Sequence, residues 1–273
     1  MAVLLRRAGH RIVAVAGSER TPDRAARFLP DVPVLPNAEA ARGAQVILIA
    51  TPDDAIGAVC SELVRAGAVR DGGAVAHLSG ATGLGALDPA AIAGAEVLSV
   101  HPLQTCPDVE AAIERIPGSA FAVTARSEPG YRLGERIATD VGGRPFRLDD
   151  AMKPLYHAAA VFASNALVAI SALAEELDRA AGVPDPAGAL EPLQRATLDN
   201  VWSFGPAAAL TGPAVRGDAA TVQLNLEALR THAPEAIPAY VALADLALGL
   251  AASAGRLPPE GAAAVREVLD RWR

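Results

Sequence analysis

The first half of the chain alternates short apolar segments with helical ones, and this alternation restricts its possible folds more than any other feature. Strands are predicted at residues 11–16, 45–50, 74–78, 96–100, 120–124 and 145–148, and those at 11–16 and 45–50 have the apolar character of buried strands. Helices are predicted at residues 1–8, 23–29 and 128–140, and from Asp53–Asp54 to about residue 66. A further short helix is expected to be capped by Asn37. Strands that alternate with helices form a parallel sheet covered on both faces. The sequence therefore predicts an α/β domain with a doubly wound parallel sheet over residues 1–148.

Polar and glycine residues follow the predicted strands of this domain. In open α/β sheets, ligands bind beyond the carboxyl ends of the strands. A nucleotide cofactor would therefore lie there, and we expect it to be held by residues in three strand-end loops: Ser18 and Arg20, Thr51 and Pro52, and Ser79 and Gly80.

His101 follows a buried strand directly, so its imidazole is placed at the same edge of the sheet and is a candidate catalytic group. His77 lies inside its strand and is interpreted as a core histidine with its hydrogen bonds satisfied. Asp53 or Asp54 is expected to cap the helix that follows rather than to take part in a reaction.

A dinucleotide-binding domain begins with a strand and a glycine-rich turn, and no such turn is found near Met1. We expect the first strand and its turn to be missing, because residues 1–8 already read as the first helix, ended by Gly9. The turn after residues 11–16 is Gly17-Ser18-Glu19-Arg20. A serine and an arginine suit the 2′-phosphate of NADP, whereas an acidic side chain such as Glu19 would suit NAD. NADP is the predicted cofactor, with NAD as the alternative.

From Asp149 onward the pattern is helical, which predicts an all-helical domain over residues 149–273. Helices are expected at residues 149–181, 186–203, after Asp218, 234–254 and 259–272. One loop interrupts them, Leu210 to Asp218, which contains two glycines, a proline and an Arg/Asp pair. It is interpreted as a loop that forms a site or a dimer contact, the alternative being a simple connector.

The helix that begins this domain carries the main candidate catalytic residues. Asp149 or Asp150 can cap it. Lys153, His157 and Ser164 then share one face at helical spacing, and Asn165 borders that face.

Lys153 is the only lysine in the chain, and every other cationic side chain is an arginine. Arginine cannot release its proton, whereas a buried lysine ammonium can donate one and recover it. Lys153 is therefore the predicted proton donor, the alternative being a salt-bridge or capping role with Asp149 or Asp150.

Composition excludes several classes of function. The net charge of −7 leaves no extended basic surface for nucleic acid, and only 4% of the residues are aromatic and could stack on bases. Cys60 and Cys106 form no metal-binding spacing and are interpreted as free thiols in a reducing cytoplasm. The most membrane-like window, residues 158–174, contains three polar side chains and is interpreted as a buried helix rather than a membrane span.

Several motifs together resemble those of bacterial proteins that join a Rossmann-like domain to domain of unknown function 2520. These motifs are His77-Leu78-Ser79-Gly80, Ser99-Val100-His101-Pro102-Leu103, Lys153-Pro154-Leu155-Tyr156-His157-Ala158-Ala159, Ser164-Asn165, and Leu210-Thr211-Gly212-Pro213 with Arg216-Gly217-Asp218. The family looks like a relative of pyrroline-5-carboxylate reductase, deazaflavin-dependent NADP reductases and ketopantoate reductase. The resemblance implies a Rossmann domain, an all-helical domain, and a homodimer formed through the helical domain.

Two hypotheses about function follow. The first is an NADP-dependent oxidoreductase that reduces a small carbonyl or imine, such as a 2-oxo acid, with the catalytic residues Lys153, His157, Asn165 and His101. In it, Lys153 donates the proton, His157 tunes the lysine or relays a proton, and Asn165 orients the substrate. The alternative is a non-catalytic, degenerate Rossmann protein that binds a ligand or partner and regulates.

Overall fold

The computed structural model describes residues 1–273, and the chain divides into two compact units, Met1–Asn165 and Ala166–Arg273. The division falls inside the long helical stretch, whereas the sequence placed the domain boundary at residues 148/149. The first unit therefore includes the helix that carries Lys153. Each unit is described by itself.

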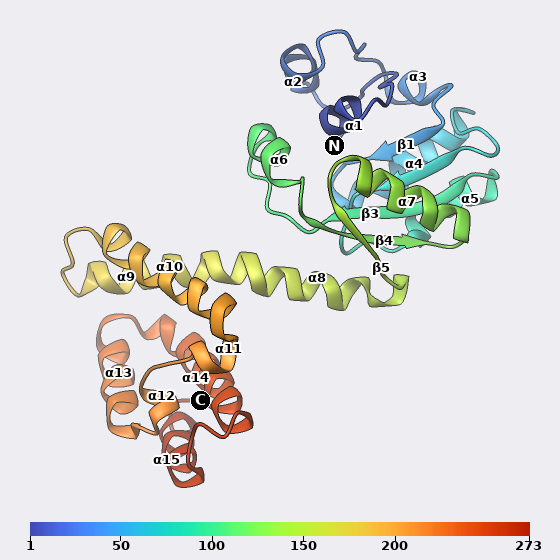
Figure 1. Cartoon of the computed structure of the whole chain (residues 1–273). Helices are drawn as coiled ribbons and strands as arrows, with labels where there is room; N and C mark the ends of the chain where they lie inside the picture. The colour runs from blue at the N-terminus through green and yellow to red at the C-terminus, as the bar shows by residue number, and fades with distance from the viewer. The chain divides into compact units, whose positions relative to one another are not determined.

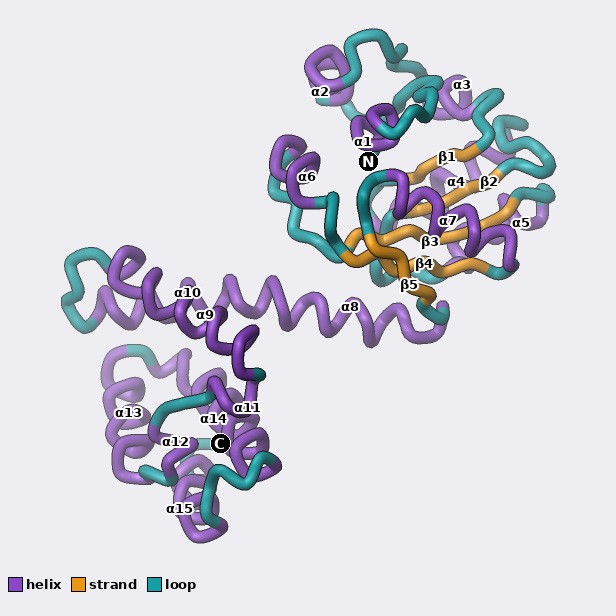
Figure 2. The backbone as a smooth tube through the Cα atoms, viewed as in Figure 1, coloured by secondary structure: helices purple, strands orange, loops and turns teal.

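The first unit is built around a five-stranded sheet (Figures 1 and 2). Its strands lie side by side in chain order: β1 (Val46–Ile49), β2 (Ala74–His77), β3 (Glu96–Pro102), β4 (Ala120–Ala125) and β5 (Arg144–Arg147). The helices of this unit are α1 (Ala2–Arg7), α2 (Thr21–Phe28), α3 (Asn37–Ala41), α4 (Ile56–Arg65), α5 (Asp88–Ile92), α6 (Val109–Arg115), α7 (Glu128–Asp140) and α8 (Lys153–Val161).

The α/β fold is confirmed, but the sheet is mixed rather than wholly parallel. β1, β2 and β3 are parallel, β4 is antiparallel to β3, and β5 is parallel to β4. The segment that connects β3 to β4 through α6 remains at the end of the sheet where β3 finishes. There the Leu103 amide donates to the Ala120 carbonyl. The chain therefore enters β4 at that end and runs antiparallel to β3.

Helices cover the two faces of the sheet (Figure 1), and a hydrophobic cluster packs on each face. Alternate strand residues face opposite sides, so Ala76 and Leu98 join one cluster and Val75 and Val97 join the other. The first cluster packs on α1 and α7, and the second packs on α4 and α5. This burial leaves the ends of the strands as the place where polar side chains gather.

The predicted strand at residues 11–16 is wrong, since it is reduced to a single bridge between Val15 and Val34. Only two backbone hydrogen bonds hold it, from the Val15 amide to the Pro33 carbonyl and from the Leu35 amide to the Val15 carbonyl. A strand requires a ladder of such bonds, and no other strand pairs with this segment. Val13 and Val34 accordingly remain 38% exposed.

The second unit is helical throughout, which confirms the predicted helical character of this part of the chain. Its helices are α9 (Leu167–Ala180), α10 (Pro186–Phe204), α11 (Pro206–Ala209), α12 (Pro213–Arg216), α13 (Ala219–His232), α14 (Ile237–Ser253) and α15 (Pro259–Asp270). Residues of α12 to α15 form its hydrophobic core. The predicted loop Leu210–Asp218 contains α12, and Val215 of that helix is buried in the core. Asp218 caps α13 by accepting from the Thr221 amide.

The expectation of a buried helix at residues 158–174 is wrong within this chain. Neither α9 nor α10 contains a buried residue. Two helical stretches, Asp150–Ala180 and Pro234–Ser253, are long and apolar enough to span a membrane when judged by length and composition, and the most apolar window of the first contains no buried residue. The apolar composition of residues 158–174 correctly predicted a helix, but it did not predict whether that helix is buried.

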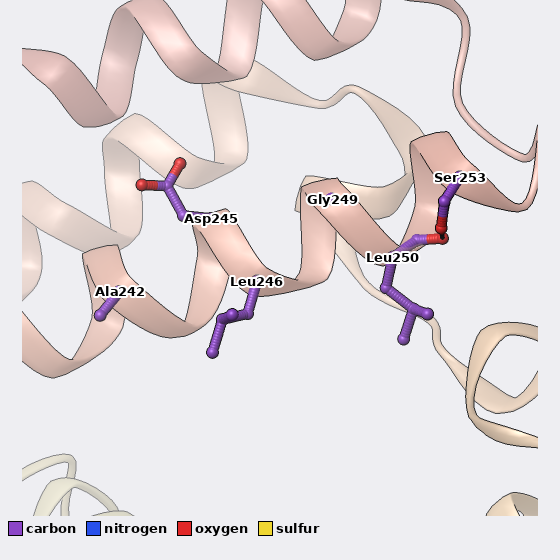
Figure 3. Close-up of a pocket in the computed structure, with 6 residues that line it drawn as sticks. All are labelled: Ala242, Asp245, Leu246, Gly249, Leu250 and Ser253. Atoms are coloured by element: carbon purple, nitrogen blue, oxygen red, sulfur yellow. Dashed lines mark hydrogen bonds between the residues drawn. The ribbon is translucent and has the colours of Figure 1, made fainter.

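A shallow surface hollow of about 750 Å³ runs along α14 (Figure 3). It is lined by Ala242, Asp245, Leu246, Gly249, Leu250 and Ser253. Its only ionisable side chain, Asp245, is paired with Arg273. None of the predicted site residues lines this hollow, so it is separate from the candidate chemistry.

Gly134 of α7 offers a test of the packing between helix and sheet. A methyl group added there would lie 2.5 Å from Val123 Cγ1 and 3.3 Å from Leu98 Cδ1. We expect Gly134→Ala to lower the free energy of unfolding by about 1–3 kcal/mol through overpacking, as measured by urea denaturation.

The matched control is Gly57→Ala in α4, where the nearest atom to the added methyl is 3.8 Å away. That substitution should be neutral or stabilise by up to about 1 kcal/mol, because alanine is the better helix former. Equal losses of stability in the two variants would contradict the close packing of α7 on the sheet.

Candidate functional site

The side chain of Lys153 is the centre of a polar cluster in the first unit. It is the first residue of α8 and only 1% exposed. Its Nζ donates to the Ser79 carbonyl at 3.0 Å and to Ser99 Oγ at 2.9 Å. The Ser99 hydroxyl donates to the same carbonyl at 3.1 Å. Three hydrogen bonds thus close a triangle that holds the amine over the ends of β2 and β3.

Burial lowers the pKa of Lys153 to about 8, although the carboxylates of Asp150 and Asp53 oppose this shift. At pH 7 the amine is therefore protonated, and it loses its proton only slightly above neutrality. A lysine in this state can exchange a proton under physiological conditions, which the arginines of the chain cannot.

Two carboxylates fix the loop that follows β2. Asp53 Oδ2 accepts from Ser79 Oγ at 2.7 Å, and Asp150 Oδ1 accepts from the Leu84 amide at 2.9 Å. The expectation that Asp53 caps a helix is wrong, because its side chain makes no capping hydrogen bond and instead holds this serine. Asp149 does cap the turn before α8, by accepting from the Ala151 amide. The polar groups of the loop are thus held from both sides.

His77 is fully buried beside the lysine. Its Nδ1 accepts from the Ser79 amide at 3.2 Å, so in the neutral ring Nε2 carries the hydrogen, and that atom has no partner. Burial and the charge of Lys153 lower the pKa of His77 to about 4. The expectation of a fully satisfied core histidine is therefore only half correct.

His101 and Tyr156 form a second, half-buried pair. Nδ1 of His101 lies 2.9 Å from the Tyr156 hydroxyl, with the rings edge to face. Gly80 makes room for the imidazole, because a methyl group at that position would lie 2.8 Å from the ring. Burial lowers the pKa of His101 to about 4 and raises that of Tyr156 to about 12. At pH 7 both side chains are neutral.

The remaining predicted residues lie on α8 and in the turn that follows it. His157 and Ser164 are half-buried, and the buried Nδ1 of His157 has no partner. Asn165 is exposed and lies in a π-helical turn, Phe162–Ala166. Local π-helical turns occur often at functional sites.

The residues predicted to bind the cofactor fall into two groups. Thr51, at the end of β1, has a buried Oγ1 without a partner, and Pro52 lies next to it on the surface. Ser79 and Gly80 belong to the lysine cluster. Ser18 and Arg20 are exposed before α2, and no hydrogen bond or ion pair connects their side chains to the cluster.

Sequence reasoning missed Ser99 and Tyr156 as members of the cluster, and it considered Asp150 only as a cap or salt-bridge partner of Lys153. Spacing could have indicated Tyr156, which lies three residues after Lys153 on the same helical face. Ser99 precedes His101 by two residues, so both side chains point to the same side of β3.

Both parts of the chain match known domain families. Residues 1–102 match a Rossmann-like domain, and residues 119–247 match domain of unknown function 2520 (DUF2520). The chain joins a Rossmann-like domain to a DUF2520 domain. The Lys153 cluster brings together residues of both matches, since Ser79 and Ser99 lie in the first and Lys153 lies in the second.

Solved structures share this fold over nearly the whole Rossmann–DUF2520 chain. A Bacteroides fragilis protein provisionally named an NADP oxidoreductase is 24% identical, with a TM-score of 0.70, and the match covers 92% of this chain and 91% of that one. The Thermotoga maritima protein TM1727 is 22% identical, with a TM-score of 0.69 and coverages of 92% and 96%. An imine reductase from Myxococcus stipitatus, solved with NADP+, is 16% identical, with a TM-score of 0.60 and coverages of 99% and 95%. A search of curated protein sequences finds no match.

The burial of Lys153 predicts a specific dependence of stability on pH. The unfolded lysine titrates near pH 10.5 and the folded one near pH 8. Between these values the unfolded state binds more protons, so folding becomes more favourable as the pH rises. Relative to Lys153→Met, the wild type should gain on the order of 2–3 kcal/mol of unfolding free energy from pH 8 to pH 10.

Urea denaturation of both proteins at several pH values measures this difference. Comparison with the variant removes the contributions of other groups, such as the thiol of Cys60, whose pKa burial raises. Parallel pH profiles for the wild type and the variant would show that the folded lysine titrates normally.

Proposed function

We propose that this protein is an NAD(P)-dependent oxidoreductase that reduces a small carbonyl or imine compound, with Lys153 as the source of the proton. The observation that carries the proposal is a buried lysine amine with a pKa of about 8, bonded to Ser79 just beyond the carboxyl end of β2 and to Ser99 of β3, two strands of the Rossmann-like domain. The fold is also that of a pyrroline-5-carboxylate reductase from Coxiella burnetii, which is 15% identical with a TM-score of 0.54. These likenesses in fold support the class of reaction and leave the substrate open.

Residues at two places fit a nicotinamide dinucleotide. The unpaired, buried Oγ1 of Thr51 offers a polar contact at the end of β1. The free side chains of Ser18 and Arg20 suit a 2′-phosphate, which favours NADP over NAD. Residues 1–16 contain no glycine-rich turn of the kind that usually binds the pyrophosphate. The cofactor, when bound, supplies the hydride.

The chain itself supplies a proton and a positive charge. The Lys153 ammonium has three hydrogens, of which two are donated to Ser79 and Ser99. The third is free to be transferred to a substrate oxygen or nitrogen, and the ammonium stabilises negative charge that develops there. His157 lies one helical turn further on, where its unpaired Nδ1 can relay a proton, and Asn165 can orient a substrate by hydrogen bonds.

One observation favours the non-catalytic alternative, a Rossmann-like protein that binds a ligand and regulates. Lys153 is only 1% exposed, and its ammonium already satisfies two acceptors within the first unit. Under this alternative the amine is a structural clamp between α8 and the sheet. The two functions differ in whether NADPH is consumed.

NADPH oxidation with a panel of 2-oxo acids and cyclic imines tests the proposed reaction. We expect the wild type to turn over at least one member of the panel. Lys153→Met should lose about 10²–10⁴-fold in kcat, the usual contribution of general acid catalysis. Lys153→Arg, which keeps the charge but cannot release the proton, should lose a comparable amount.

Thermal shifts with NADPH and NADH provide the control in the same experiment. Both lysine variants should retain the shift with NADPH, and Arg20→Ala should lose it with NADPH more than with NADH. Unchanged turnover in Lys153→Met would refute the role of the lysine. A shift with NADPH but no oxidation of it with any substrate would favour the non-catalytic alternative.

We also propose that the chain forms a homodimer through its helical domain. Large apolar side chains on α9 and α10 are exposed: Val168 by 68%, Leu193 by 64%, Trp202 by 84% and Phe204 by 68%. Apolar surface on this scale usually marks an interface. A second copy of the same chain offers the same apolar face, as a two-fold interface requires.

Light scattering after size-exclusion chromatography tests the dimer. The wild type should have twice the monomer mass of 27.8 kDa. Trp202→Glu should shift it towards the monomer, because a charge in the interface cannot be paired. Ile92→Glu is the matched control, since Ile92 is 87% exposed on α5 of the first unit, and it should leave the mass unchanged. A monomeric wild type would contradict the proposal.

A further inference from the structure

Ser99 is a fully buried hydroxyl in the interior of β3, between Leu98 and Val100. A hydroxyl in such a position destabilises the fold unless it is hydrogen-bonded. The register of the sheet places His77 of β2 on one side of it and Thr124 of β4 on the other. A polar row therefore crosses three adjacent strands beneath the Lys153 amine.

The members of this row differ in their hydrogen bonds. His77 Nε2 and Thr124 Oγ1 are buried without partners. Ser99 Oγ, in contrast, both donates to the Ser79 carbonyl and accepts from Lys153 Nζ. Because its single hydrogen is committed to the carbonyl, its lone pairs are free to face the amine. The direction of the Ser99 hydroxyl is thus fixed by the backbone and not by the lysine.

We propose that Ser99 is the positioning residue of Lys153, which orients the amine beside the end of β2 and holds it in the protonated form. The importance of Ser99 for catalysis rests on the function proposed above, whereas its effect on the protonation of Lys153 does not. An oxygen that accepts from an ammonium favours the charged form over the neutral one. Loss of this acceptor in a desolvated place should make the proton easier to lose.

Several other ionisable groups surround the amine, and two of them are carboxylates that change its pKa. Asp53, in the loop after β1, and Asp150, just before α8, raise the pKa of Lys153. His77 on β2 and His101 on β3 are neutral at pH 7, and so is Tyr156 on α8. His157, the single histidine of α8, has a buried nitrogen without a hydrogen-bond partner. None of these groups is bonded to Ser99, so its replacement alters one contact of the amine directly.

The single lysine makes the test direct. Protein labelled with 13Cε,15Nζ-lysine gives one lysine signal, which belongs to Lys153, and its shift can be followed from pH 6 to pH 10. In the wild type the midpoint should lie near 8. In Ser99→Ala it should fall by about one pH unit, the effect expected for one hydrogen bond to a charged group. Ser99→Thr keeps the hydroxyl and should restore the wild-type midpoint.

Thr124→Val is the matched control. It removes a buried hydroxyl from the same polar row, and this hydroxyl has no hydrogen bond to the amine or to any other group. The Lys153 midpoint should stay unchanged, and circular dichroism confirms the fold of each variant. An unchanged midpoint in Ser99→Ala, or an equal shift in Thr124→Val, would overturn the positioning role.

Activity adds a second readout where the wild type turns over a substrate. A proton donor loses activity as the pH rises through its pKa, so in Ser99→Ala the alkaline limb of kcat should move down by the same interval, with KM little changed. The expected titration in a protein without turnover would support the role of Ser99 and refute the proposed oxidoreductase. Turnover together with an unchanged Lys153 midpoint in Ser99→Ala would support the proposed oxidoreductase and refute the role of Ser99.

Discussion

The hydrogen bond from the Lys153 ammonium to the Ser79 carbonyl is the interaction on which the first unit depends most. A buried charge is costly unless it is paired and hydrogen-bonded. Here the charge is met by two oxygens at short range, and by Asp53 and Asp150 through space. The same contact fastens α8 to the ends of β2 and β3. This explains why α8 belongs to the first compact unit although helix-forming sequence continues beyond it.

Stability alone does not account for the surroundings of the lysine. Thr51, His77, Thr124 and His157 each leave a buried polar atom without a partner in the first unit. Each such atom costs on the order of 1–3 kcal/mol, and native proteins contain few of them. One of them, His77, lies close enough to Lys153 for the charge of the amine to lower the pKa of the imidazole.

Much of the fold was predictable from sequence because it depends on local patterns. All five strands of the sheet were predicted within a few residues. β1 to β4 are mostly apolar runs between turn residues, whereas β5 carries two arginines and is largely exposed. The segment at residues 11–16 has the same pattern but remains almost unpaired, because pairing depends on a neighbour and not on the segment itself. The reversal of β4 could not be predicted for a similar reason. It depends on where the connection through α6 leads.

The site was predictable only in part. Spacing on a helix indicated the shared face of Lys153 and His157, and strand ends indicated Ser79 and His101. Pairings between elements were not visible, so Asp53 was interpreted as a cap although it binds Ser79, and Ser99 was not singled out although it binds the lysine. In the same way, apolarity identified the helix around residues 158–174, whereas its exposure depends on surfaces that no local pattern describes.

The geometry of the cluster gives a second reason why a lysine stands at position 153 in a chain that otherwise uses arginine. Ser79 and Ser99 offer two acceptor oxygens to a side chain that is almost completely buried. An ammonium with three donors nearly matches them, whereas a guanidinium with five would leave three buried N–H groups unsatisfied. Its charge would also be permanent, so a change in pH could not relieve the cost of burial. The number of acceptors therefore favours lysine here without any reaction, and the exchange of a proton in the reaction proposed above would favour it further.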